Sequence, residues 1–145
     1  MRLYLMRHGE AEFNARDDIQ RSLTATGRAA VASKTSFIEP VDRMVVSPYL
    51  RALQSSDILI AEGLSVQRRI VDERVTPDCD LQPVIDEVIL PDVEVQLIVA
   101  HNPLLSRLIH LLCGEQAANI QLDTADLACL TGDFLPGCSS LLWLR

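Results

Sequence analysis

The sequence lacks several features that would place the protein in other classes. It has no apolar run long enough to cross a membrane, and its net charge of −7 opposes the basic surface that general nucleic-acid binding needs. The chain opens with a short apolar run, not with a charged leader followed by a long apolar segment, so no signal peptide is expected. These absences predict a cytoplasmic protein that binds neither membranes nor nucleic acids.

Aromatic residues are scarce, and no group of residues is spaced as a set of metal ligands. Aromatics make up only 4% of the chain, so the core should consist mainly of Leu, Val, Ile and Ala. No Cys-x-x-Cys pair occurs, and no His, Cys and Asp cluster has the spacing of a metal site. We therefore expect no cofactor, and reduced, mostly buried thiols rather than disulfides at Cys79, Cys113, Cys129 and Cys138.

What the sequence does contain is an alternation of short apolar runs with segments of helical spacing. The runs predict strands at residues 3–6, 43–47, 66–71, 95–100, 126–131 and 139–144. Helices are predicted between them, at about 23–38, 49–61, 80–88 and 102–114. This order favours one domain, residues 1–145, with a three-layer α/β/α fold, a mostly parallel central sheet and an antiparallel C-terminal strand pair. Arg68 and Arg69 interrupt the third strand and place it at or near an edge.

A possible reactive site begins where the first strand ends, at Arg7-His8-Gly9. Ligands of an open α/β sheet bind beyond the carboxyl ends of its strands. A neutral imidazole is a competent nucleophile, and a guanidinium group matches the geometry of phosphate oxygens. Gly9 would let the chain turn away sharply. Together these residue types suggest phosphoryl transfer through histidine, although the triplet alone could equally be an ordinary polar turn.

Two further strand ends carry matching side chains. Ser47-Pro48 could begin a helix, with Ser47 as its cap and Arg51 in its first turn, where backbone amides favour an anion. The central strand leads directly to His101. Because the carboxyl ends of parallel strands meet at one edge, two histidines and two arginines are expected to face a single pocket. The polar segment 10–22 is predicted to form a loop or a short helix over it.

These motifs resemble those of the histidine phosphatase superfamily, in the family's order and over essentially the whole chain. The matching segments are Arg7-His8-Gly9, Leu23-Thr24-x-x-Gly27, Ser47-Pro48-x-x-Arg51-Ala52-x-Gln54 and His101-Asn102-Pro103. The short length and direct connections look most similar to phosphohistidine phosphatases of the SixA type. The resemblance implies a phosphoglycerate-mutase-like fold, with His8 as the nucleophile that becomes phosphorylated. It also implies that Arg7, Arg51 and His101 bind the phosphoryl oxygens and stabilise the charge that spreads over them.

Three further residues match the family less closely. Asn14 is similar to a phosphate-contacting asparagine of the mutase-like members, but it could equally make a local turn. Family members that act on esters usually have a glutamate as general acid at the exit of the third strand, where Glu73 is the best match. Glu73 could instead belong to a solvated loop. Asp80 is the substitute candidate, although capping the next helix is its simpler role.

The chain departs from the larger members of the family in having no helical lid. Only residues 76–81 join the third strand to the next helix, so the pocket should be shallow and suited to a residue on another protein's surface. The resemblance therefore implies a metal-independent protein phosphohistidine phosphatase acting on phosphotransfer domains or phosphocarrier proteins in signal transduction. The alternatives are a small-molecule phosphomonoesterase or mutase, and a non-catalytic module that binds phosphorylated proteins.

Overall fold

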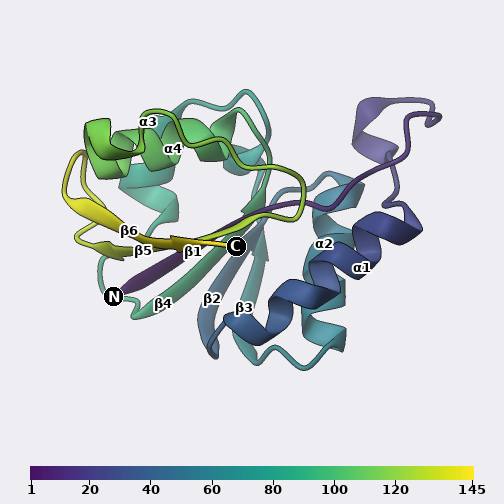
Figure 1. Cartoon of the computed structure of the whole chain (residues 1–145), viewed down its shortest axis with the longest axis horizontal. Helices are drawn as coiled ribbons and strands as arrows, with labels where there is room; N and C mark the ends of the chain where they lie inside the picture. Colours follow the sequence, from purple (N-terminus) through teal and green to yellow (C-terminus); the bar gives the residue numbers. More distant parts are fainter.

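The computed structural model describes residues 1–145, which form a six-stranded sheet between two layers of helices (Figure 1). The strands are β1 (Arg2–Arg7), β2 (Val41–Val46), β3 (Val66–Val71), β4 (Val95–Ala100), β5 (Leu127–Gly132) and β6 (Ser139–Leu144). Their order across the sheet is β3-β2-β4-β1-β5-β6. The first four strands pair in parallel, as β3-β2, β2-β4 and β4-β1. β5 is antiparallel to β1, and β6 is antiparallel to β5. The predicted fold class is confirmed.

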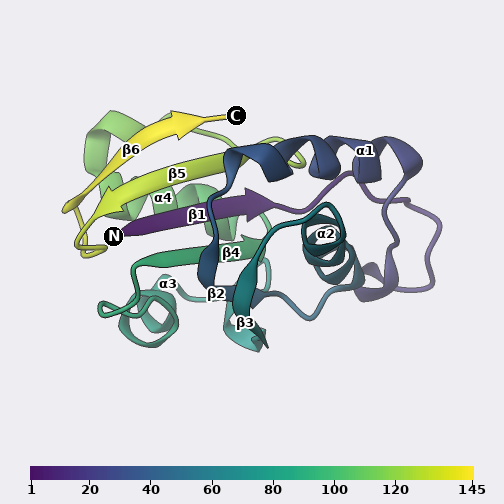
Figure 2. The same cartoon turned by 90° about the horizontal axis from the view of Figure 1, so that it is seen from below.

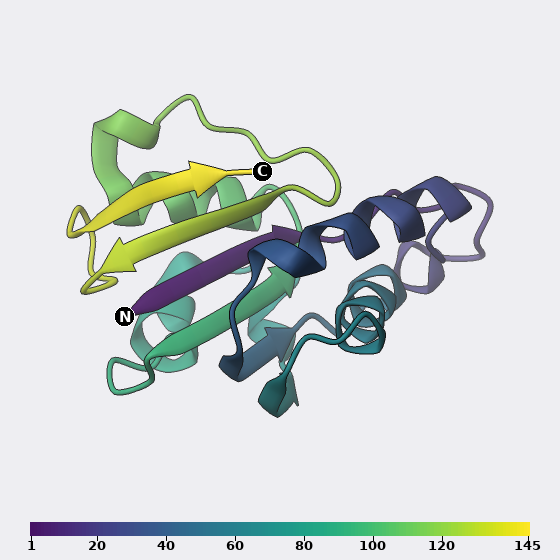
Figure 3. The same ribbon diagram turned by 60° about the horizontal axis from the view of Figure 1, so that its bottom comes forward.

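The helices connect successive strands and cover both faces of the sheet (Figures 2 and 3). They are α1 (Ala25–Lys34), α2 (Leu50–Ala61), α3 (Leu81–Pro83), which continues as a π-helical turn at Val84–Val88, and α4 (Leu104–Cys113). Short 3-10 turns lie at Asp18–Gln20, Thr35–Phe37, Glu73–Val75 and Gly114–Ala117. No helix is both long enough and apolar enough to span a membrane.

The side chains of β1 divide between two hydrophobic clusters, because successive residues of a strand point to opposite faces. Leu3 and Leu5 pack with α4 and the π-helical turn, and Tyr4 and Met6 pack with α1 and α2. All four are buried, which explains the unbroken apolar run at the start of the chain. The buried hydrophobic residues are mostly Leu, Val, Ile and Ala, as predicted.

The edge position of β3 is confirmed, and both Arg68 and Arg69 are exposed. The expectation of mostly buried cysteines is wrong. All four are free thiols, but only Cys129, on β5, is buried. Cys138 is exposed because it lies in the turn between β5 and β6. Cys79 and Cys113 are half-buried against the hydrophobic cluster that contains Leu3, Leu5 and α4.

The start of α2 differs from the prediction. The helix begins at Leu50 after Tyr49, whose side chain makes no capping bond, so Ser47 is not the cap. The Ser47 hydroxyl instead lies 2.6 Å from Nε2 of His101, and it accepts a hydrogen bond from the Tyr49 N–H at 3.3 Å. At α1 the predicted cap is present, since the Thr24 hydroxyl accepts the Gly27 N–H at 2.9 Å.

Gly9 and Gly27 allow the segment after β1 to lie directly against α1. A Cβ added to Gly27 would stand 2.2 Å from the Glu10 carbonyl oxygen, and one added to Gly9 would stand 2.8 Å from that of Gly27. Gly9 does not have a positive φ, so close packing rather than a sharp turn explains the glycine. This contact fixes where the chain leaves His8.

We expect Gly27→Ala to destabilise the fold, although Ala normally favours a helix over Gly by about 1 kcal/mol. The added Cβ has no room against the Glu10 backbone, and overpacking of this kind costs roughly 1–3 kcal/mol or more. Urea unfolding of this variant beside Thr26→Ala, one residue away on the exposed side of α1, would measure the effect. A Gly27→Ala protein as stable as the wild type would contradict the packing argument.

Candidate active site

Three neighbouring strands end level with one another and bring the predicted residues to one edge. β1 and β4 pair to their last residues, with Arg7 opposite Ala100, and the His8 N–H donates to the Ala100 carbonyl at 3.0 Å. The Ser47 N–H donates to the Val99 carbonyl at 3.1 Å. The first residues after β1, β2 and β4 therefore lie side by side at the carboxyl edge of the sheet.

The hydrogen bonds of His8 determine which ring nitrogen can react. Nδ1 lies 2.7 Å from the Gly9 carbonyl oxygen, which can only accept, so Nδ1 must carry the proton. Nε2 therefore keeps its lone pair, and it accepts a bond from Nε of Arg51 at 3.2 Å. The imidazole is 6% exposed and is held with this nitrogen toward the arginine. This is the tautomer that a nucleophilic Nε2 requires.

Burial keeps His8 neutral. Loss of hydration lowers the pKa of His8 to about 4, and the positive charges of Arg51 and Arg7 act in the same direction. The hydrogen bond to the Gly9 carbonyl opposes them but is outweighed. Burial likewise lowers the pKa of His101, with His8 and Arg51 as the next largest causes. Both imidazoles are neutral at pH 7.

We expect the C–H resonances of His8 to titrate near pH 4 and not near the ordinary histidine value of about 6.5. The unfolded chain binds a proton at His8 below about pH 6.5 while the folded protein resists it, so stability should fall as pH drops from 6.5 toward 4. NMR titration of the free protein, assigned with a His8→Gln variant, measures the first effect. A His8 midpoint at or above 6.5 would contradict this environment.

Arg51 is held by an aspartate that the sequence did not single out. Its Nη1 donates to the backbone carbonyl of Asp18 at 2.6 Å, and its Nη2 to the Asp18 carboxylate at 3.1 Å. The guanidinium is buried, and its Nε edge is directed at His8. Asp18 thus fixes the plane of the Arg51 guanidinium. Desolvation alone would raise the pKa of the Asp18 carboxyl, but hydrogen bonds from Arg21 and Arg51 outweigh it and hold that pKa below the ordinary value.

His101 and Arg7 each have a buried nitrogen without a partner in the protein. The ring of His101 lies 5.0 Å from that of His8 and 4.8 Å from that of Tyr49, and its Nδ1 is unpaired. Arg7 donates through Nη1 to the Leu122 carbonyl at 2.9 Å, whereas its Nε is unpaired. Buried polar nitrogens are rarely left without partners, so these two indicate a place for an additional hydrogen-bonding group.

A cavity of about 380 Å³ opens at this edge. Its walls are formed by Arg7, His8, Glu10, Ala11, Phe13, Asp18, Arg21, Arg51, Pro77, Asn102 and Thr124. Three of the four principal predicted residues therefore line it, and the fourth, His101, packs beside His8 without forming part of the wall. Segment 10–22 covers the cavity as predicted, through its 3-10 turn at Asp18–Gln20 and the side chains of Asp18 and Arg21.

The less closely matching residues lie outside this wall. Glu73 is exposed in the 3-10 turn that follows β3, and Asn14 is exposed on the loop, next to Phe13. Asp80 is the N-cap of α3, where its carboxylate accepts the Gln82 N–H at 3.2 Å. Neither Glu73 nor Asn14 is in the cavity wall, and Asp80 has the simpler of its two predicted roles.

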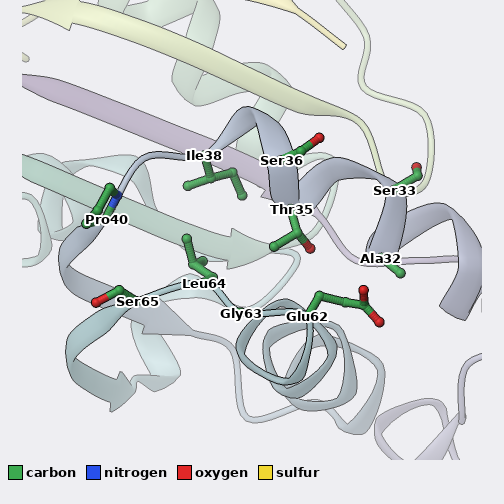
Figure 4. Close-up of a pocket in the computed structure, with 10 residues that line it drawn as sticks. All are labelled: Ala32, Ser33, Thr35, Ser36, Ile38, Pro40, Glu62, Gly63, Leu64 and Ser65. Carbon is green, nitrogen blue, oxygen red and sulfur yellow. The ribbon is translucent and has the colours of Figure 1, made fainter.

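The largest cavity, about 450 Å³, lies at the opposite edge of the sheet (Figure 4). It is enclosed by the carboxyl ends of α1 and α2 and by the residues before β2 and β3. Its polar groups are hydroxyls and the Glu62 carboxylate, with no histidine or arginine. The chemically equipped cavity is therefore the one beside His8.

The fold and the cavity beside His8 define a class of protein: an α/β protein whose parallel strand ends bring a neutral imidazole and two arginines into the wall of one cavity. The family model of the histidine phosphatase superfamily (branch 1) matches residues 3–74. A phosphohistidine phosphatase SixA homolog of Haemophilus influenzae is 33% identical in an alignment 130 positions long, which covers 80% of this chain and 79% of that protein. The chain belongs to the histidine phosphatase superfamily.

Two further relatives support this assignment. Phosphohistidine phosphatase SixA of Escherichia coli is 28% identical in an alignment 121 positions long, which covers 78% of this chain and 74% of that protein. A solved structure of the protein histidine phosphatase SixA, complexed with tungstate, superposes with a TM-score of 0.88. The match covers 100% of this chain and 96% of that chain at 27% identity.

Proposed function

We propose that the chain is a protein phosphohistidine phosphatase that forms a covalent phosphohistidine on His8. The observation that carries the proposal is the unprotonated Nε2 of His8, fixed by the Gly9 carbonyl and placed beside Arg51 in the cavity wall. The names of the SixA relatives support the same activity. Tungstate is a tetrahedral oxyanion, so its presence in the SixA structure supports a phosphoryl site in this fold.

Two displacements complete the proposed reaction. Nε2 of His8 attacks phosphorus, the P–N bond of the substrate breaks, and the substrate imidazole leaves with the electron pair and takes up a proton from solvent. Water then attacks the phosphorus on His8 and returns a proton to solvent, and the P–N bond breaks so that Nε2 regains its electron pair and phosphate is released. Arg7 and Arg51 neutralise the charge that the phosphoryl oxygens carry in each step.

The Arg51 contact with His8 must change during the first step. Nε of Arg51 now donates to the lone pair that would attack phosphorus. As the phosphoryl group arrives, this N–H can donate to a phosphoryl oxygen in a stronger charge-assisted bond, which frees Nε2. The two bonds to Asp18 keep the guanidinium in place throughout.

A protein substrate fits this cavity better than a free metabolite, because only the short segment 10–22 covers it. Residues 72–80 connect β3 to α3 without a covering domain, and Pro77 in this connection forms part of the wall. A metabolite needs enclosure to be held and to exclude water, whereas a residue on a protein is positioned by the surrounding surface. We infer that the substrates are phosphotransfer domains or phosphocarrier proteins of signal transduction.

The leaving group distinguishes this function from the phosphate-ester alternative. An imidazole leaves with a conjugate-acid pKa of about 6.5, whereas an alkoxide needs a proton delivered as it departs. A general acid contributes roughly 10²–10⁴ in rate, and the predicted acid, Glu73, lies outside the cavity wall. The site is therefore better suited to breaking a P–N bond than an ester P–O bond.

We expect the protein to hydrolyse a histidine-phosphorylated phosphotransfer domain with a kcat/KM at least about 10² above that for an alkyl phosphate. Because Glu73 lies outside the cavity wall, Glu73→Gln should leave the rates on both substrates nearly unchanged. Asp80→Asn, which keeps the helix cap, is the matched control and should change neither. A preference for the ester would overturn the proposed substrate. Equal slowing of both substrates by Glu73→Gln would instead mean that phosphate binding is damaged.

A further inference from the structure

Two large apolar side chains are exposed on the loop that covers the cavity. Phe13 is 90% exposed and Ile19 is 51% exposed. The loop projects beyond the carboxyl edge of the sheet (Figures 1 and 3), and Phe13 itself lines the cavity. Nothing in the chemistry proposed for His8 needs an apolar group there. Exposed aromatic side chains beside a site are typical of protein interfaces.

The loop holds Phe13 in a defined position. Arg21 donates from Nε to the Glu12 carbonyl at 2.7 Å and from Nη2 to the Ala11 carbonyl at 3.3 Å. Its guanidinium carbon lies 4.9 Å from the centre of the Phe13 ring, and its Nη1 donates to the Asp18 carboxylate at 3.1 Å. Arg21 therefore supports the ring from one side, so little conformational entropy would be lost when a partner covers the other.

The charge of the loop restricts the kind of partner. Glu10, Glu12, Asp17 and Asp18 outnumber Arg16 and Arg21, so segment 10–22 has a net charge of −2. The arginines of the cavity, by contrast, suit an anion. A partner that inserts a phosphoryl group here should have apolar side chains next to it and basic side chains outside them, since complementary charge favours the encounter.

We propose that Phe13 and Ile19 are docking anchors for a folded protein substrate whose phosphohistidine is bordered by apolar and then by basic side chains. The inference rests on the proposed function, because the docked residue is the one that His8 would attack. It goes further by naming the surface that selects the protein, separate from the residues that act on the phosphoryl group.

The test compares Phe13→Ala with Phe37→Ala. Phe37 is a matched control: it is 44% exposed and has the Arg145 guanidinium over its ring at 5.4 Å, but it lies in the 3-10 turn after α1. Each variant is assayed on a phosphotransfer domain with a basic surface around its phosphohistidine, and on free N-phosphohistidine. Phe13→Ala should raise KM for the domain about tenfold and affect the rate on free phosphohistidine far less, because only the domain would cover the exposed face of the ring. Phe37→Ala should change neither.

Binding provides a second measurement that does not need turnover. In a His8→Ala background, Phe13→Ala should raise the Kd for the phosphorylated basic domain about tenfold. A phosphorylated domain with an acidic surface should bind poorly even when Phe13 is present. An unchanged KM and Kd would overturn the docking role, and so would equal slowing of both substrates. If the wild type hydrolyses neither substrate but Phe13→Ala still weakens binding, the proposed phosphatase function fails while the docking surface stands.

Discussion

Replacing His8 with alanine should reduce turnover of phosphohistidine by about 10⁴–10⁶-fold, the loss seen when a covalent nucleophile is removed. No other side chain presents an unprotonated imidazole nitrogen in the wall of the cavity. The fold should survive, because His8 is not part of either hydrophobic cluster. Phosphate release and circular dichroism, measured on the same preparation, separate loss of chemistry from loss of structure.

His110→Ala is the control for this substitution, since it removes an exposed histidine from α4. It should leave both activity and fold unchanged. A folded His8→Ala protein with activity near that of the wild type would remove His8 as the nucleophile. No turnover by the folded wild type would instead favour the third interpretation of the sequence, a module that binds phosphorylated proteins without turning them over.

Arg51→Lys should lower kcat/KM by roughly 10²–10³-fold, although it conserves the charge. Arg51 directs three nitrogens at two partners: Nε at His8, and Nη1 and Nη2 at Asp18. A lysine ammonium is a single point charge and cannot bond to Asp18 and to His8 at the same time, so the donor beside His8 would be lost. Steady-state kinetics on free N-phosphohistidine measure the effect without a contribution from docking.

Arg69→Lys provides a matched comparison, because Arg69 pairs with Asp57 on the surface, at the edge strand β3. Exposed ion pairs contribute about 0–1 kcal/mol, so this variant should behave as the wild type. Near-normal activity of Arg51→Lys would show that only the charge of Arg51 matters. That result would contradict the positioning by Asp18.

The sequence predicted those parts of the fold and site that depend on local pattern. The strands and most helix limits follow from apolar runs and helical spacing. Arg7, His8, Arg51 and His101 come together because each ends a parallel strand, directly follows one, or lies in the first turn of the helix after one. The topology of such a sheet places these positions at one edge, whatever the details of packing.

The parts that the sequence did not predict depend on how distant segments approach one another. Asp18 contacts Arg51 only because the loop folds back over the strand ends, and no local pattern distinguishes it from Asp17. Ser47 looked like a helix cap until the neighbouring strand placed His101 beside its hydroxyl. The exposure of Cys138 follows from the geometry of one turn. The one available signal, a carboxylate in a loop over two arginines, applies equally to Asp17 and Asp18.

The central claim is that the phosphoryl group is carried on Nε2 of His8, and one measurement tests it directly. The protein is mixed with a histidine-phosphorylated phosphotransfer domain and quenched in base after milliseconds, since phosphohistidine survives there. The site of modification is located by mass spectrometry, and ³¹P NMR distinguishes the two ring isomers. We expect a single phosphorylated residue, His8, modified on Nε2, and none in His8→Ala. Phosphate on another residue or on Nδ1, or rapid turnover with no phosphoenzyme, would contradict the mechanism.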